Sequence, residues 1–293
     1  MPECYTHSHI AAQALVRSGQ VVASHPAFLA GANGPGPLYM YKIWRRNPHP
    51  NLPALANKMQ HEKTGAFLNA LVHLAITPVQ QSYALGFLTH YVADCILHPY
   101  VAAMCQTGAP YSMPNGHSWM ESSLDSTLYH QSYKTYFVPL HAGTPVLITE
   151  DLAQVANLLR EAISQVYERD IPTVALSDTF HDNLKVRGML ISKHGGKRAL
   201  AALVEPLRFA KKGKGFIRSH MQPAAPLKKL PTTWVNPYTG VSYNITTEEI
   251  LTDAEAAAAN CITAAMGYWL GNLDNEQLAQ ALGNNDYFTG LPL

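Results

Sequence analysis

Apolar side chains recur at helical spacing through most of the chain. The segments 59–76 and 152–167 each place apolar residues three and four positions apart, which predicts two amphipathic helices. The alternation of period two that marks β-strands is nearly absent, with one short candidate at 242–246. The pattern therefore predicts an all-α protein with long irregular connections.

Two capping signals predict where further helices begin and end. Thr77–Gln80 forms a capping box with proline at the first helical position, and we expect this helix to run to His98, before Pro99 stops it. A second box, Thr252–Glu255, is expected to begin a helix that ends at Gly271.

The predicted helix 78–98 carries His90, Asp94 and His98 at intervals of four, and His117 and Glu121 follow with the same spacing. Residues four apart on a helix lie about 5–6 Å from each other at Cβ, so each pair can present two ligands to one ion. The two outer histidines of the first helix are separated by about 12 Å along its axis, too far to share an ion with bonds of about 2 Å. We therefore expect at least two ions, with Asp94 as a bridging carboxylate and His98 joining His117 and Glu121.

Ligand chemistry favours zinc for this cluster. A single histidine or aspartate on a helix is usually a hydrogen-bonded residue, but five of them in an apolar setting would be costly to bury without partners. Imidazole and carboxylate without thiolate favour zinc, followed by manganese, iron and nickel. Cys95 is turned about 100° away from Asp94 on the helix, and we interpret it as a small buried hydrophobe.

Composition describes a globular chain with a substantial core. Of its 293 residues, 47% are apolar and 14% are charged. No linker or repeat divides the chain, so we expect one domain over 1–293. We expect the metal ligands within 1–125 and a helical scaffold with a basic region over 126–293. Four cysteines without tight spacing indicate reduced thiols. The absence of a signal-type start and of a long apolar run predicts a cytoplasmic protein.

Several segments together resemble the zinc-dependent phospholipase C and P1-type nuclease superfamily, in particular its intracellular bacterial branch. They are THSHIA, GANGPGP, QHEKT, LGFLTHYVADCILHPY and HSWMESSLD, which span roughly residues 5–125, with a weaker similarity in WVNPYTG. The resemblance implies a mostly helical fold that holds three zinc ions in a cleft and hydrolyses a phosphate ester. It also implies the following ligand sets: His61, His90 and Asp94 for one zinc; His98, His117 and Glu121 for a second; His7 and Asp94 for a third, shared in secreted members with the amino-terminal residue.

The sequence departs from the family pattern in two places. Gly36 stands where GANGPGP-like segments usually end in an aspartate that binds zinc or a zinc-bound water. Only six residues precede His7, so whether the nitrogen of Pro2 reaches a third zinc is open. Without a carboxylate at position 36, Glu121, Asp125 or a bridging hydroxide would have to act as general base, although Asp125 is equally suited to orient a histidine ring.

The function expected from this cluster is that of a zinc-dependent phosphodiester hydrolase of the phospholipase C type. Zinc lowers the pKa of bound water from 15.7 to about 7, which provides a hydroxide to attack phosphorus. The candidate catalytic residues are Asp94, Glu121 and Asp125. Two alternatives remain: a single-strand nuclease or nucleotidase of the same fold, and a catalytically weak metal-binding protein that binds lipid or a partner, which Gly36 favours.

Positive charge gathers in one part of the chain. Between 185 and 229 stand twelve of the 21 basic residues and one acid, Glu205. A solvated basic face explains this as well as a binding surface does. Aromatic residues among the lysines predict peripheral contact with an anionic membrane, consistent with a phospholipid substrate, and the net charge of +1 makes nucleic acid a weaker candidate. The residues proposed for this contact are Phe209, Lys211, Lys212, Lys214 and Phe216.

Overall fold

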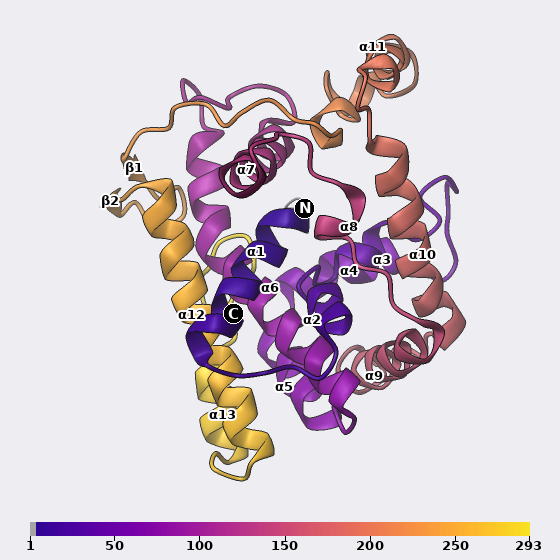
Figure 1. The fold of residues 1–293 in the computed structure, drawn as a ribbon, viewed down its shortest axis with the longest axis vertical. Helices are drawn as coiled ribbons and strands as arrows, with labels where there is room; N and C mark the ends of the chain where they lie inside the picture. Colours follow the sequence, from indigo (N-terminus) through magenta and orange to yellow (C-terminus); the bar gives the residue numbers. More distant parts are fainter. Residues whose placement is uncertain (1–3) are drawn as a thin grey trace.

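The computed structural model describes residues 4–293, and the predicted all-α class is confirmed, with two very short strands beside the helices (Figure 1). The α-helices are α1 Cys4–Ser18, α2 His25–Gly31, α3 Gly36–Tyr39, α4 Leu52–His61, α5 Thr64–Leu74, α6 Pro78–Met104, α7 Gly116–Tyr133, α8 Leu140–Gly143, α9 Thr149–Tyr167, α10 Thr173–Leu190, α11 Gly196–Arg208, α12 Thr247–Trp269 and α13 Asn275–Leu282. The 3-10 helices are η1 Ala210–Lys212 and η2 Arg218–His220, and the strands are β1 Thr233–Val235 and β2 Ser242–Asn244.

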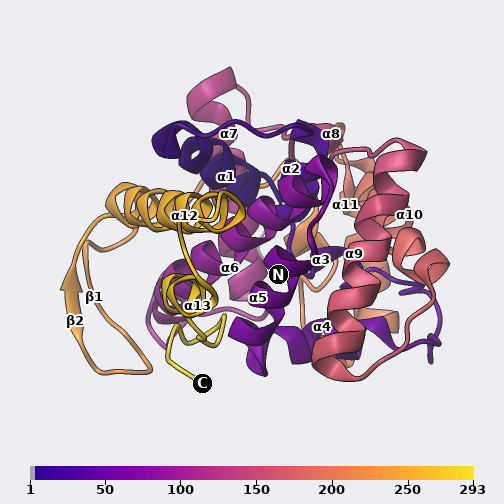
Figure 2. The same cartoon turned by 90° about the horizontal axis from the view of Figure 1, so that it is seen from below.

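Helix α6 lies at the centre of the molecule, with α1, α2 and α12 packed along it (Figures 1 and 2). Its predicted capping box is present: the Thr77 hydroxyl accepts from the Gln80 amide, and the Gln80 side chain accepts from the Thr77 amide. Most of its residues are buried, because apolar side chains cover more than one face. A buried central helix thus carries His90, Asp94 and His98.

The prediction that Pro99 ends this helix is wrong, because α6 continues to Met104. Proline has no N–H, so the carbonyl of Cys95 loses its helical donor. Gly290 lies against this carbonyl so closely that a Cβ at position 290 would collide with it. Burial of α6 on several sides offsets the cost of an interior proline, about 3 kcal/mol.

Two other predicted boundaries also need correction. The helix expected over 59–76 is two helices, α4 and α5, because Lys63 adopts a left-handed conformation with φ 55°. The capping box of α12 is formed by Thr246 and Glu249, six residues before the one predicted, and the Thr252 hydroxyl instead donates to the Glu248 carbonyl within the helix. Both errors concern helix boundaries, which are the part of a helix that is hardest to place to within a few residues.

The strand expected at 242–246 is confirmed as β2, which pairs antiparallel with β1 and places Trp234 opposite Tyr243. This hairpin is small and lies beside α12 (Figure 2). Among residues 4–293, no helix combines the length and apolarity needed to cross a bilayer.

Helices α2 and α6 cross in close contact because each contributes a glycine. A Cβ on Gly31 would collide with the carbonyl of Tyr83, and one on Gly86 would collide with the carbonyl of Phe28. The crossing brings the chain after α2 beside His90, whose Nδ1 donates to the carbonyl of Ala32 at 3.1 Å. The glycines therefore set the position of a candidate ligand.

The segment 284–293 returns to the centre of the molecule after α13. The amide of Tyr287 donates to the carbonyl of Gln60, and the amide of Asn285 donates to the Tyr91 hydroxyl. Tyr287 is fully buried, so the segment is part of the core. It lies directly against the middle of α6.

The basic region contains α11, which extends away from the other long helices (Figure 1). Phe209 and Phe216, which are predicted to contact a membrane, are half-buried with ring centroids 5.5 Å apart, and their membrane contact stays a prediction. Lys211, Lys212 and Lys214 are exposed, so a basic surface here stays a prediction.

Candidate metal centre

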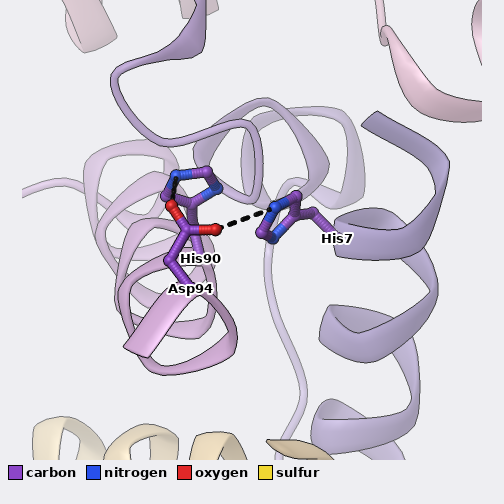
Figure 3. A group of neighbouring side chains, drawn as sticks. All are labelled: His7, His90 and Asp94. Atoms are coloured by element: carbon purple, nitrogen blue, oxygen red, sulfur yellow. Dashed lines mark ion pairs between the residues drawn. The ribbon is translucent and has the colours of Figure 1, made fainter. Parts of the chain in front are cut away.

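The first candidate ligand group joins α1 and α6. His7 Nε2 lies 3.3 Å from Asp94 Oδ1, and His90 Nε2 lies 3.1 Å from Asp94 Oδ2 (Figure 3). The ring centroids of the two histidines are 4.2 Å apart. All three side chains are buried, and they offer ligand atoms within 4.8 Å of one another.

The second group joins α6 and α7. His117 Nε2 lies 2.6 Å from Glu121 Oε1, and His98 Nε2 lies 3.6 Å from the same oxygen. His98 and Glu121 are buried, whereas the side chain of His117 is 30% exposed. This group therefore lies at the solvent side of the site.

Asp94 connects the two groups, as the helical spacing predicts for a bridging carboxylate. Its Oδ1 lies 3.3 Å from His7 Nε2 and 3.5 Å from His98 Nε2, while its Oδ2 is next to His90. Burial would raise the pKa of Asp94, but the adjacent His98 and His90 outweigh it and hold this pKa well below its usual range.

The histidine rings are oriented so that Nε2 faces the centre. His90 Nδ1 donates to Ala32 O, and His98 Nδ1 donates to Tyr287 O at 2.9 Å, which leaves each Nε2 as the acceptor atom. A carbonyl partner on the outer nitrogen is the usual support of a metal-bound histidine. Among the described residues, Nε2 of His7, His90 and His98 makes no regular hydrogen bond despite being buried. Such atoms fit a cation.

The pKa values of two histidines move in opposite directions. Burial, assisted by the nearby His90, lowers the pKa of His7 to about 4. Burial opposes protonation of His98 as well, but Asp94 and Glu121 outweigh it and raise its pKa. His7 is therefore neutral near pH 7, the form in which imidazole binds a metal.

Asp125 lies against the first turn of α1. Its carboxylate accepts from the amides of Tyr5 and Thr6, at 3.0 and 2.7 Å, and from the Thr6 hydroxyl at 2.6 Å. It thus holds the first turn of α1, one residue before His7. Asp125 thus positions the backbone that carries a candidate ligand, and its predicted roles as a general base or as a partner of a histidine ring stay predictions.

His61 lies outside both groups. Its Nδ1 is 2.5 Å from Asp286 Oδ2, and its ring stacks on Phe288 at 5.0 Å. The place beside His90 and Asp94 that the resemblance gave to His61 is occupied by His7. In this arrangement His61 contacts the segment 284–293 and shares no ligand group.

Gly36, which stands where the family usually has an aspartate, lies next to the first ligand group. It lines a small pocket with His7, His90, Gln60 and Arg187. An aspartate at this position would therefore be near the first group. Pro2 belongs to residues 1–3, so its role as a ligand lies outside the described residues.

Three contributors to the site were not predicted from the sequence. The Tyr287 carbonyl and the Phe288 ring, 4.6 Å from the His98 ring, come from a segment with no ligand-type pattern. Gly34 has φ 52° and lies against the His90 ring, where a Cβ would collide. Of these three, only Gly34 could have been predicted from the sequence, because GANGPGP contains glycines, which adopt positive φ readily. Cys95 belongs to neither group, as expected, and burial raises the pKa of its thiol.

A family model described as zinc dependent phospholipase C matches residues 6–170. The match covers more than half of the chain and includes all six residues of the two ligand groups. The chain belongs to this family. The predicted relationship to zinc-dependent phospholipases C is thereby confirmed. Comparisons with curated proteins and with solved structures give no significant match.

Zinc-dependent phospholipases C act on phosphate esters such as phospholipids, and the donor set of this member fits their metal. Four imidazoles and two carboxylates converge without a thiolate. The buried nitrogen atoms that face one another at the centre have no alternative partners of regular geometry among the described residues. The residues present therefore suit a zinc-dependent member of a hydrolase family.

Proposed function

We propose that this protein is a zinc-dependent phosphodiester hydrolase of the phospholipase C type, acting on a phospholipid or a related phosphate ester. The supporting observation is the pair of three-residue groups, of which the first contributes Asp94, 3.5 Å from His98 of the second. His7, His90 and Asp94 would hold one zinc, and His98, His117 and Glu121 a second. We therefore expect two ions, the lower of the two numbers predicted from the sequence.

The zinc ions, when bound, supply Lewis acidity toward phosphoryl oxygens and acidify water. The protein supplies the rest of the chemistry. Burial of Asp94 and three of the histidines excludes bulk water, and the partly exposed His117 marks the side from which substrate approaches. Glu121, next to His117, is our candidate for accepting the proton released on this side.

The alternative of a catalytically weak, metal-binding protein is supported by Gly36. This residue lines the pocket beside His7 and His90, so the carboxylate that the family usually has here is absent next to the candidate ligands. General bases contribute about 10²–10⁴ in rate, so such a protein would keep its metal and lose most of its activity.

The first test is the zinc content of the purified protein by plasma mass spectrometry. We expect about two zinc ions per chain and the loss of about one in each of His90→Ala and His117→Ala. His194→Ala removes an exposed histidine and serves as control. A wild-type content well below one, unrestored by added zinc, would exclude the hydrolase.

Activity is tested next, on phosphatidylcholine, bis(p-nitrophenyl) phosphate and single-stranded DNA. Cleavage of the lipid with loss in both variants supports the phospholipase assignment. Cleavage of DNA alone would favour a nuclease. Full zinc content with no turnover would favour the binding protein.

A further inference from the structure

Helix α11 presents an apolar stripe to solvent. Leu200, Leu203 and Leu207 are 61%, 71% and 84% exposed. Their spacing of three and four residues places them on one face of the helix. Contiguous exposed leucines are uncommon on the surface of a globular protein and mark interaction sites.

The opposite face of α11 is fixed to the protein by a polar contact. Glu205 is buried and accepts from the amides of Gly215 and Ile217 and from Nε of Arg218, at 2.8–3.0 Å. Ala201 is buried one turn earlier on the same face. Since the inward face is occupied, the leucines are held outward by the fold.

The exposed charged residues of α11 and of the segment 209–214 that follows it are positive. Lys197 and Arg208 are exposed on α11, and Lys211, Lys212 and Lys214 follow it on the surface. Glu205 is the one acidic residue between 185 and 229, and its carboxylate forms an ion pair with Arg218. A helix with an apolar face and flanking lysines and arginines is typical of segments that lie in the interface of an anionic membrane.

We propose that α11 binds the surface of an anionic membrane, with Leu200, Leu203 and Leu207 at the boundary of the acyl chains and the basic residues against lipid phosphates. Basic side chains near such a surface are attracted by its negative potential. A second copy of this chain would instead bring its own basic residues against these, which is unfavourable. The proposal goes beyond the hydrolase function and does not depend on zinc.

The test is co-sedimentation with vesicles of phosphatidylcholine containing phosphatidylserine, compared with vesicles of phosphatidylcholine alone. We expect wild type to prefer the anionic vesicles. The triple variant Leu200→Ser, Leu203→Ser, Leu207→Ser should bind at least ten-fold more weakly. The variant Val16→Ser, Val21→Ser removes two equally exposed apolar side chains elsewhere and should bind like wild type. Circular dichroism of each variant checks that the fold is retained.

A second variant tests the charge contribution alone. Lys211→Gln, Lys212→Gln, Lys214→Gln should lose most of the preference for anionic vesicles and its dependence on salt. His117→Ala, expected to be inactive as a hydrolase, should bind as wild type does, so binding and hydrolysis can fail separately.

Three results would overturn the proposal: no binding by wild type, undiminished binding by the leucine variant, or equal binding to neutral vesicles. A dimer in solution that the leucine variant dissociates, without vesicle binding, would assign the stripe to a second copy instead.

Discussion

Asp94 is the side chain on which both ligand groups depend. It has no exposed surface, and Nε2 of three histidines lies within 3.5 Å of its oxygens. A buried charge is tolerated only when it is paired. The Asp94 oxygens and the three Nε2 atoms make no regular hydrogen bonds among the described residues, so a bound cation would supply the charge that pairs this carboxylate.

Position 36 allows the missing carboxylate to be restored. Gly36→Asp places an acid in the pocket beside His7 and His90. If the proposed chemistry operates, kcat/KM on bis(p-nitrophenyl) phosphate should rise at least ten-fold, because a general base is added. Gly36→Asn is nearly isosteric without the charge and should give no increase. An equal effect of both substitutions would contradict a base at this position.

Asp125 should matter for stability more than for chemistry. Asp125→Asn weakens three hydrogen bonds to the start of α1, and hydrogen bonds to charged groups contribute about 1.5–3 kcal/mol each. We expect a loss of about 2–3 kcal/mol in the free energy of unfolding, measured by urea denaturation. Asp253→Asn changes an exposed aspartate and should have almost no effect. Unchanged stability in Asp125→Asn would contradict its role as an anchor.

The crossing of α2 and α6 is the contact between elements that tolerates least change. Gly86→Ala should destabilise the protein by about 3 kcal/mol or more, since the added methyl group collides with backbone, which cannot rotate away. Gly188→Ala in α10 meets only the Leu140 side chain at 3.7 Å. This control should be neutral or stabilising by up to about 1 kcal/mol. Chemical denaturation of both variants measures the difference, and equal values would contradict the close crossing.

Zinc should stabilise the whole molecule, because its ligands come from α1, α6 and α7. A ligand at 1,000 times its Kd adds about 4 kcal/mol per site. With about 2–4 °C per kcal/mol for a domain of this size, the Tm should rise by roughly 10 °C or more on adding zinc. A chelator should reverse the rise, and calcium should not reproduce it. A Tm that does not respond would contradict a metal site built across these helices.

A structural feature of this protein can be predicted from the sequence when the residues that determine it are close together along the chain. His90, Asp94 and His98 were placed correctly because helical spacing is local, and Thr77 marked the start of α6 for the same reason. The prediction that Pro99 ends α6 was wrong because packing of this helix against distant parts of the chain outweighs the local effect of proline. The Tyr287 carbonyl could not be predicted, since every residue carries one and only the tertiary fold aims it at His98.

The contact between Tyr287 and His98 also bears on how the protein is made. The ribosome adds Tyr287 long after Glu121, so a nascent chain that already contains all six donor side chains still lacks the carbonyl that orients one of them. Metal binding in the proposed arrangement would therefore be complete only after residue 287 has left the exit tunnel. A chain terminated before residue 287 would keep all six donor side chains without their final geometry, and we expect it to be more susceptible to cellular proteases.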